Sequence, residues 1–142
     1  MSAQTPNSDR RKLDIYCGPA YHPWDYYTIY TGLRGSWKAI AIIADTLSMQ
    51  YGWQVRIYGQ PEQPSVINGV HYEHYRSFNP NEYRDVIVAS RRPELLETQM
   101  VAKVKVYHHE DLCDGQYFFP HYHHIFVSQY QRDRFVDDHK LD

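Results

Sequence analysis

The sequence predicts an α/β sandwich built on a mostly parallel sheet. Segments that are apolar at alternate positions, or apolar throughout, alternate along the chain with segments whose apolar residues recur at helical spacing. The run DVIVAS at 85–90 is almost wholly apolar, as expected of a central parallel strand buried on both faces. Alternation of strands and helices favours parallel pairing, because each helix returns the chain to the same end of the sheet.

The first elements are a tail, a strand and a loop. Residues 1–12 are polar and lack periodicity, which predicts a flexible tail ahead of a domain at 13–142. Leu13, Ile15 and Cys17 alternate before a Gly-Pro turn, which predicts the first strand. Residues 21–35 are rich in aromatic residues and contain proline and two glycines, which predicts a long loop of the kind that often carries function.

The best helix in the sequence is predicted over 36–51. Ser36 is a natural N-cap, and Gly52 is a natural stop at the other end. Apolar residues recur at helical spacing along it, namely Ile40, Ile43, Ala44, Leu47 and Tyr51. Apolar residues lie on more than one side of this segment, so we expect burial on more than one side.

The remaining pattern continues the alternation. Strands are predicted at 53–59, 69–78, 85–90, 101–109 and 123–128. Helical pieces are predicted at 91–99 and 129–139, and turn-rich connections at 61–69 and 110–122. Because ligands bind at the carboxyl ends of parallel strands, the loops after Cys17, Ser90, His109 and Ser128 should converge on one edge of the sheet.

Composition excludes several classes of protein. The 142 residues suit one domain, and 15 basic against 17 acidic residues argue against broad electrostatic binding of nucleic acid. Two cysteines make no disulfide framework, no apolar run approaches the roughly 20 residues of a membrane span, and the first ten residues show no secretory signal. A cytoplasmic location is therefore expected.

The segment 32–36, ahead of the long helix, is a candidate phosphate site. Gly35 lets the backbone approach a ligand, and the helix amino terminus beginning near Ser36 offers unpaired N–H groups and partial positive charge. Arg34 would add a full positive charge. The alternative is that the glycines form a turn and that Ser36 only caps the helix.

Two predicted strand ends carry further candidates. His109 would point into the ligand edge, where Glu110 could orient it or bind hydroxyl groups; the alternative is a solvated strand end. Arg91 follows the central strand and could meet a phosphate or carboxylate, or instead cap nearby carbonyls. The histidines of HHEDLC and HYHH match no established zinc spacing, so no metal is predicted; a metal-dependent enzyme that uses this histidine loop is a third alternative.

The order of these motifs resembles the amino-terminal half of GT-B glycosyltransferases of family 4 (glycosyltransferase group 1). The resemblance starts with Gly35-Ser36, Ala44 and Leu47 of the long helix, Gly52 before the next strand, and Tyr58-Gly59 at its end. It continues through Asn68-Gly69-Val70 with Tyr72, DVIVASRRPELL, VKVYHHED and IFVSQYQRDRF, and so covers about residues 13–137.

The resemblance implies a Rossmann-like three-layer sandwich with a mostly parallel sheet, which holds the acceptor in a retaining, two-domain enzyme. Gly35, Ser36 and Arg34 would lie beside the donor diphosphate, and His109 would be the catalytic residue near the transferred sugar. Arg91, Glu110, Trp24 and Tyr26 would bind substrate, since Tyr and Trp pack well on sugars. The nucleotide sugar is a substrate, so no cofactor is expected.

The chain departs from the family pattern. Arg34 and Trp37 stand where the family has a glycine and an acidic residue, and Trp53 replaces a histidine. No carboxylate pair of the donor site is present, so this chain is expected to be a truncated half or one subunit of a split enzyme. The partners would then be a nucleotide sugar, a glycan or lipid acceptor, and a carboxy-terminal domain or second chain. The alternative is a stand-alone glycan- or nucleotide-binding module that pairs with a second chain.

Overall fold

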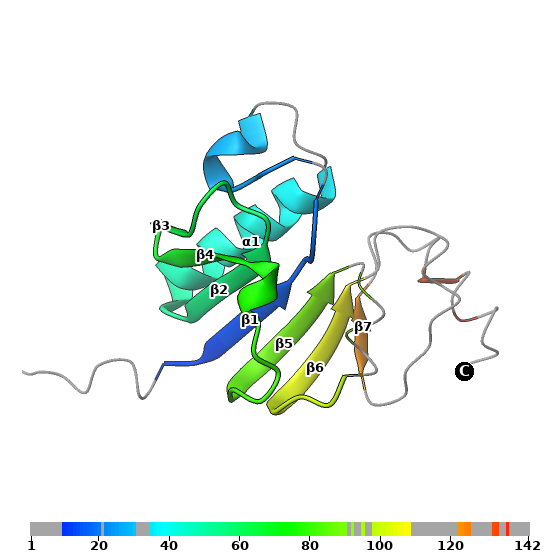
Figure 1. Ribbon diagram of the computed structural model, residues 1–142. Coiled ribbons are helices and arrows are strands. Elements are labelled where there is room, and N and C mark those ends of the chain that lie inside the picture. Colours follow the sequence, from blue (N-terminus) through cyan, green and yellow to red (C-terminus); the bar gives the residue numbers. More distant parts are fainter. Residues whose placement is uncertain are drawn as a thin grey trace, which may run out of the picture.

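A computed structural model describes residues 10–20, 22–30, 35–90, 92, 95, 98–108, 122–125, 132, 133 and 136 (Figure 1). The strands are β1 (Lys12–Tyr16), β2 (Gln54–Gly59), β3 (Ser65–Ile67), β4 (Val70–His74), β5 (Arg84–Ser90), β6 (Ala102–His108) and β7 (His123–Ile125). The helices are α1 (Gly35–Tyr51) and the 3-10 turns η1 (Tyr26–Tyr30) and η2 (Tyr75–Ser77). No helix in this part of the chain has both the length and the apolar character needed to cross a membrane.

The strands form one seven-stranded sheet in the order β3-β4-β2-β1-β5-β6-β7. β3 pairs antiparallel with β4, and every other neighbouring pair is parallel. This confirms the α/β class and the mostly parallel sheet. Without β3, the strands in chain order occupy positions 3-2-1-4-5-6, which is the strand order of doubly wound dinucleotide-binding folds.

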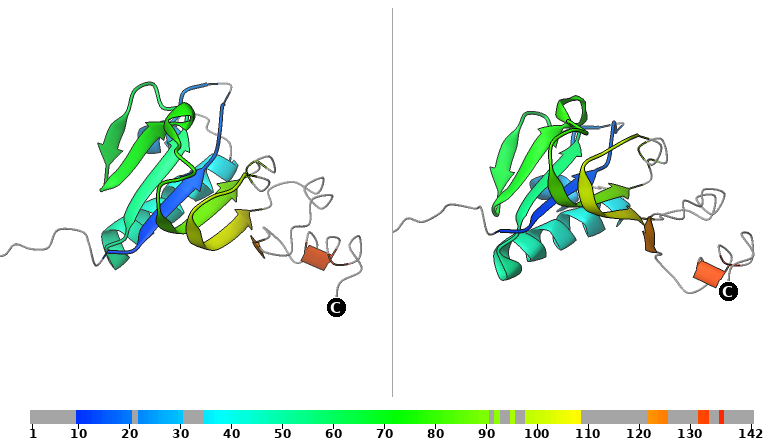
Figure 2. Two further views of the ribbon diagram at one scale, coloured as in Figure 1. Left: turned by 60° about the horizontal axis from the view of Figure 1, so that its bottom comes forward. Right: turned by 90° about the horizontal axis from the view of Figure 1, so that it is seen from below.

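Helix α1 covers one face of the sheet, as Figure 2 shows from below. Its buried residues Ile40, Ala41 and Ala44 pack on inward residues of β1, β2 and β4. The helix begins at Gly35, one residue before the predicted start, so Ser36 lies in its first turn. Gly52 follows the last turn with a φ of 69°, which confirms the predicted stop, because glycine adopts this left-handed conformation without a steric cost.

The opposite face is crossed by the connection from β4 to β5 (Figure 2). Phe78 in this connection lies 5.2 Å from the ring of Tyr16 and 5.2 Å from that of Tyr58. A second buried cluster, with Ile87 and Tyr107 in it, lies against the same face. Among the elements whose bounds the structure describes, α1 is the one α-helix, so a three-layer sandwich with helices on both faces stays a prediction.

The 61–69 segment differs from the predicted connector, because three of its residues form β3. The chain turns from β3 to β4 through Asn68, with a φ of 55°, and Gly69, with a φ of 82°. Two successive positive φ values characterise the type I′ turn, which Asn-Gly favours in hairpins. A three-residue strand behind two prolines offers too little alternation to be predicted, although the Asn-Gly pair was a usable signal.

Candidate ligand-binding site at the carboxyl edge of the sheet

The carboxyl ends of β1 and β5 mark the point where the sheet changes direction. The two strands are parallel neighbours, with Tyr16 beside Ala89. The chain leaves β1 toward β2 on one side, whereas it leaves β5 toward β6 on the other. The loops after the two strands therefore diverge, and this is where open α/β sheets bind their ligands.

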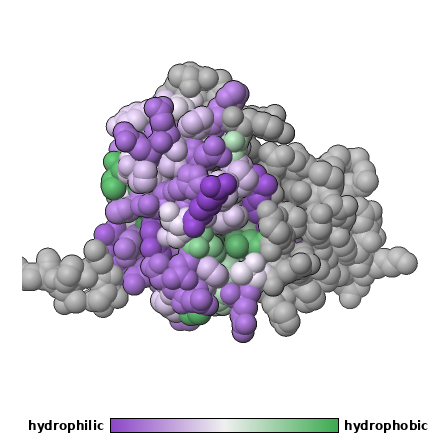
Figure 3. Space-filling model, in the orientation of Figure 1, coloured by the Kyte–Doolittle hydropathy of each residue, from purple (hydrophilic) through white to green (hydrophobic). Residues whose placement is uncertain are grey.

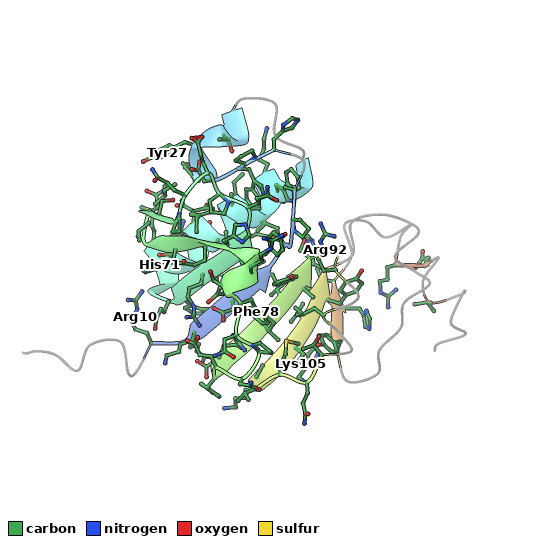
Figure 4. All side chains as sticks on the ribbon, in the orientation of Figure 1. Arg10, Tyr27, His71, Phe78, Arg92 and Lys105 are labelled. Carbon is green, nitrogen blue, oxygen red and sulfur yellow. The ribbon has the colours of Figure 1, made fainter. Side chains whose placement is uncertain are left out.

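Arg92 occupies this point (Figure 4). Its Nε donates to the Cys17 carbonyl oxygen at 2.9 Å, and its Nη2 donates to the Pro19 carbonyl oxygen at 2.6 Å. Gly18 makes the approach possible, because a Cβ at that residue would lie 2.6 Å from Arg92 Nε. A half-buried guanidinium is thus fixed beside the end of β1, and its planar fork suits phosphate and carboxylate.

The segment after β1 is tied to the end of β2. The Cys17 and Gly18 N–H groups both donate to the Tyr58 carbonyl oxygen, at 2.8 and 3.2 Å. Farther along, the N–H of Ala20 donates to Gln60 Oε1 at 2.9 Å, and that of Trp24 to the Gln60 carbonyl oxygen at 3.0 Å. These bonds fix the backbone beside the ligand edge in one conformation.

Trp24, a predicted substrate-binding residue, lies in the core. It is 1% exposed, stacks on Trp37 at 5.4 Å with an interplanar angle of 6°, and meets Tyr72 edge-on at 6.3 Å. Its indole also lies on Gly59, where a Cβ would be 3.3 Å from the ring. This packing fixes the segment that leads into η1 against α1 and the sheet.

Tyr26 is half-buried in η1 and packs against the same core, with the ring of Tyr27 edge-on at 6.0 Å. Tyr27 is 69% exposed (Figure 4), and we did not predict it as a binding residue. In a run of successive aromatic residues, the sequence does not indicate which ring faces solvent. Gly35 and Ser36 begin α1, and the structure describes their backbone but not the Ser36 side chain.

The other predicted site residues lie outside the described residues: Arg34, Arg91, His109 and Glu110. Their neighbours do reach the ligand edge. Ser90 and His108 are opposite each other at the ends of β5 and β6, and they are 4% and 8% exposed. Of the four loops predicted to meet at this edge, those after His109 and Ser128 lie outside the described residues, while Arg92 from the segment after β5 contacts the segment after β1. Within the residues described, no three His, Cys, Asp or Glu side chains are grouped as metal ligands would be.

A buried charge network on the face opposite α1 was not predicted. Asp14, 1% exposed, accepts from Arg56 Nε at 2.8 Å and Nη2 at 3.0 Å, and from Arg84 Nε at 2.8 Å. Arg56 also pairs with Glu82 at 2.8 Å, and Arg84 lies over the Phe78 ring at 4.6 Å. The signal was present, because Asp14 and Arg56 each interrupt an apolar strand between two inward residues.

The network changes the acidity of its neighbours. Burial alone would lower the pKa of Arg56, but its hydrogen bond to Asp14 and the charge of Asp14 raise that pKa above its ordinary value. Burial, and next the charge of Asp14, raise the pKa of Tyr58 to about 12. Both side chains therefore keep their protons at neutral pH. The network holds neighbouring strands together and does not act as a proton donor.

The ligand edge thus combines a fixed cation, a tightly held glycine turn and the start of α1 near a topological switch point. The chain matches no protein-family model, no curated protein and no solved structure, so the geometry of this edge carries the functional argument.

Proposed function

We propose that this chain binds a phosphorylated, hydroxyl-rich ligand at the carboxyl edge of its sheet, as the acceptor-side domain of a retaining, sugar-nucleotide-dependent glycosyltransferase. The observation that carries the proposal is Arg92, held over Gly18 by two carbonyls at the point where the sheet changes direction. The 3-2-1-4-5-6 strand order supports it, because ligands of such sheets bind at that point. The finer proposal for the fold is a Rossmann-like three-layer sandwich.

The residues would act mainly by positioning and by electrostatic stabilisation. Arg92 and Arg34, with the N–H groups at the start of α1, would stabilise the negative charge that develops on a leaving diphosphate. His109 would orient the transferred sugar, and Arg91 and Glu110 would hold hydroxyl or phosphate groups beside it. Tyr26 and the exposed Tyr27 would line the acceptor side. The reaction itself would use a second domain or chain that binds the nucleotide sugar.

Calorimetric titration with a panel of nucleoside diphosphate sugars, free nucleotides and free sugars tests the proposal. We expect the diphosphate sugars to bind, and Arg92→Gln to weaken binding about tenfold or more, since a charged hydrogen bond contributes about 1.5–3 kcal/mol. Arg92→Lys keeps the charge but loses the fork, and should be intermediate. Arg76→Gln, an exposed site at η2, is the matched control. Equal affinity in all four proteins would remove Arg92 from the site.

The alternative function, a binding module that pairs with a second chain, is favoured by the outer face of α1. Ile42, Ile43 and Met49 are 49%, 47% and 63% exposed there. The described part of the opposite face is largely hydrophilic (Figure 3). Exposed apolar side chains gathered on one element often mark a contact surface. Analytical ultracentrifugation of the chain and of Ile43→Lys tests whether that second chain is another copy, because a monomer at every concentration in both proteins argues against self-pairing.

A further inference from the structure

The outer side of α1, which faces away from the sheet, carries a stripe of apolar and small residues (Figure 2). The stripe consists of Ala39, Ile42, Thr46 and Met49, which follow one another at intervals of three, four and three residues. This is the spacing at which one helix contacts another along a shared seam. A helix that covers one face of a sheet needs apolar residues on its inner side only. The exposed stripe therefore points to a second contact of α1.

The polar residue within the stripe already has its hydrogen bond. Thr46 Oγ1 donates to the Ile42 carbonyl oxygen of the same helix at 2.9 Å. A partner that covers the stripe therefore does not leave this hydroxyl group buried without a hydrogen bond, which would be costly. Ala39 is exposed and small, so a second backbone can come close at that point. Both properties suit the stripe to direct contact with another helix.

The charges of α1 indicate which helix that is. The helix has two charged residues, Lys38 and Asp45, which lie seven positions apart and so share one side of the stripe, about 10 Å from each other along the axis. Within the part of the chain that the structure describes, neither residue makes an ion pair. Their opposite charges lie at nearly equal distances before and after Ile42. A pattern of this kind is complementary to an antiparallel copy of itself.

We propose that α1 packs against α1 of a second copy of this chain, antiparallel and crossing beside Ile42. In this arrangement Ile42 meets Ile42 of the second copy, Ala39 faces Thr46, and Lys38 of each copy pairs with Asp45 of the other. The two-fold symmetry makes each of the unlike contacts twice. One pair of helices is smaller than a standard interface, so the dimer forms weakly and depends on concentration. The proposal names the second chain of the alternative function above, and it does not rest on the ligand proposed for the carboxyl edge.

Sedimentation equilibrium of the full chain, over concentrations up to the millimolar range, measures the dimer dissociation constant. We expect Ile42→Lys to raise this constant tenfold or more, roughly, because it places a charge at the centre of the contact. Lys38→Glu and Asp45→Lys should each raise it about tenfold, since each turns two attractive pairs into two repulsive ones. Asp45→Asn removes the attraction alone and should have a smaller effect. Lys103→Glu, at an exposed lysine on β6, is the matched control and should leave the constant unchanged.

Exchanging the two charges gives the sharper test. A chain that carries both Lys38→Glu and Asp45→Lys should dimerise as tightly as the unaltered chain, and an equal mixture of the two single variants should form a mixed dimer. Circular dichroism of each variant checks that α1 is intact. An unaltered chain that stays monomeric at every concentration would overturn the proposal, as would single variants that dimerise like the unaltered chain. The measurement uses no ligand, so its outcome is separate from that of the titration with diphosphate sugars.

Discussion

Gly18 and Gly52 have nearly the same backbone conformation, with φ values of 71° and 69°, but very different surroundings. A Cβ at Gly52 would meet nothing within 4 Å, whereas one at Gly18 would lie 2.6 Å from Arg92 Nε. Both residues are glycine for a conformational reason. Gly18 has a second reason, which is to leave room for the guanidinium at the ligand edge.

We expect Gly52→Ala to cost about 1–2 kcal/mol, the strain of a left-handed residue. Gly18→Ala should cost about 2 kcal/mol more, because it also displaces Arg92 from two carbonyls. Urea unfolding measures both. In an Arg92→Ala background the additional cost of Gly18→Ala should disappear. Equal losses for the two alanines in the unaltered chain would contradict the role given to Arg92.

Replacement of Asp14 should lower the free energy of unfolding the most. Asp14→Ala leaves Arg84, which is 0% exposed, and Arg56 without their shared carboxylate, and should destabilise the fold by about 3–5 kcal/mol. Glu82→Gln removes a carboxylate that is 46% exposed and should change stability by less than about 1 kcal/mol. Denaturant midpoints of the two variants check the contrast, and similar midpoints would show that the network is not buried in solution.

At the scale of elements, α1, β1, β2 and β6 were predicted because each carries its own periodicity, and β5 because its run is almost wholly apolar. β3 was missed because its pairing with β4 depends on a turn and not on its three residues. The crossing from β4 to β5 was missed for another reason. Its apolar contact with the sheet is the Phe78 ring, packed on Tyr16 and Tyr58, and one ring leaves no pattern in a sequence.

The β3–β4 turn allows a test of that element. Asn68 is exposed, so a substitution there acts through the backbone. Asn68→Ala should destabilise the chain by about 1–2 kcal/mol, since alanine resists a φ of 55°, while Asn68→Gly should be close to neutral. Thermal unfolding of the pair checks this. Equal stability of the two variants would mean that the turn is not type I′.

At the scale of the whole molecule, the sequence predicts the edge of the sheet at which we propose that a ligand binds, but not the contacts at that edge. Alternating strands and helices predict a parallel sheet, and a parallel sheet predicts where ligands bind. Of two successive arginines after the central strand, Arg91 was taken as the binding residue. The structure places Arg92 over Gly18. The hydrogen bond from Arg92 to the Cys17 carbonyl oxygen joins residues that are 75 positions apart. No local pattern encodes a contact over that distance.

Buried tyrosines should make the whole fold sensitive to alkali. The pKa of Tyr58 and that of Tyr122 are raised by burial to about 12, against about 10 in an unfolded chain. Their stabilising contribution is complete below about pH 10 and is lost as pH rises toward about 12, because the unfolded state releases its protons first.

Tyr58→Phe should therefore flatten the decline of stability across this alkaline range. Tyr27→Phe, at a site that is 69% exposed, is the matched control and should leave the decline unchanged. Urea unfolding at a series of pH values, with phenolate absorbance recorded in parallel, provides the measurement. A decline of the same slope in Tyr58→Phe would show that Tyr58 ionises freely in the folded chain.

The Asp14 network also constrains the order in which the chain assembles. Its bonds join residues 42 and 70 positions apart, so Asp14 meets Arg56 when β1 and β2 pair but meets Arg84 only after β5 arrives. Contacts of such long range form slowly, because a large loop must close first. An early β1–α1–β2 unit would hold a half-paired carboxylate on an uncovered face. Docking of β5 beside β1 then completes the charge pairing of Asp14, so we expect β5 to be the strand that commits the chain to its fold.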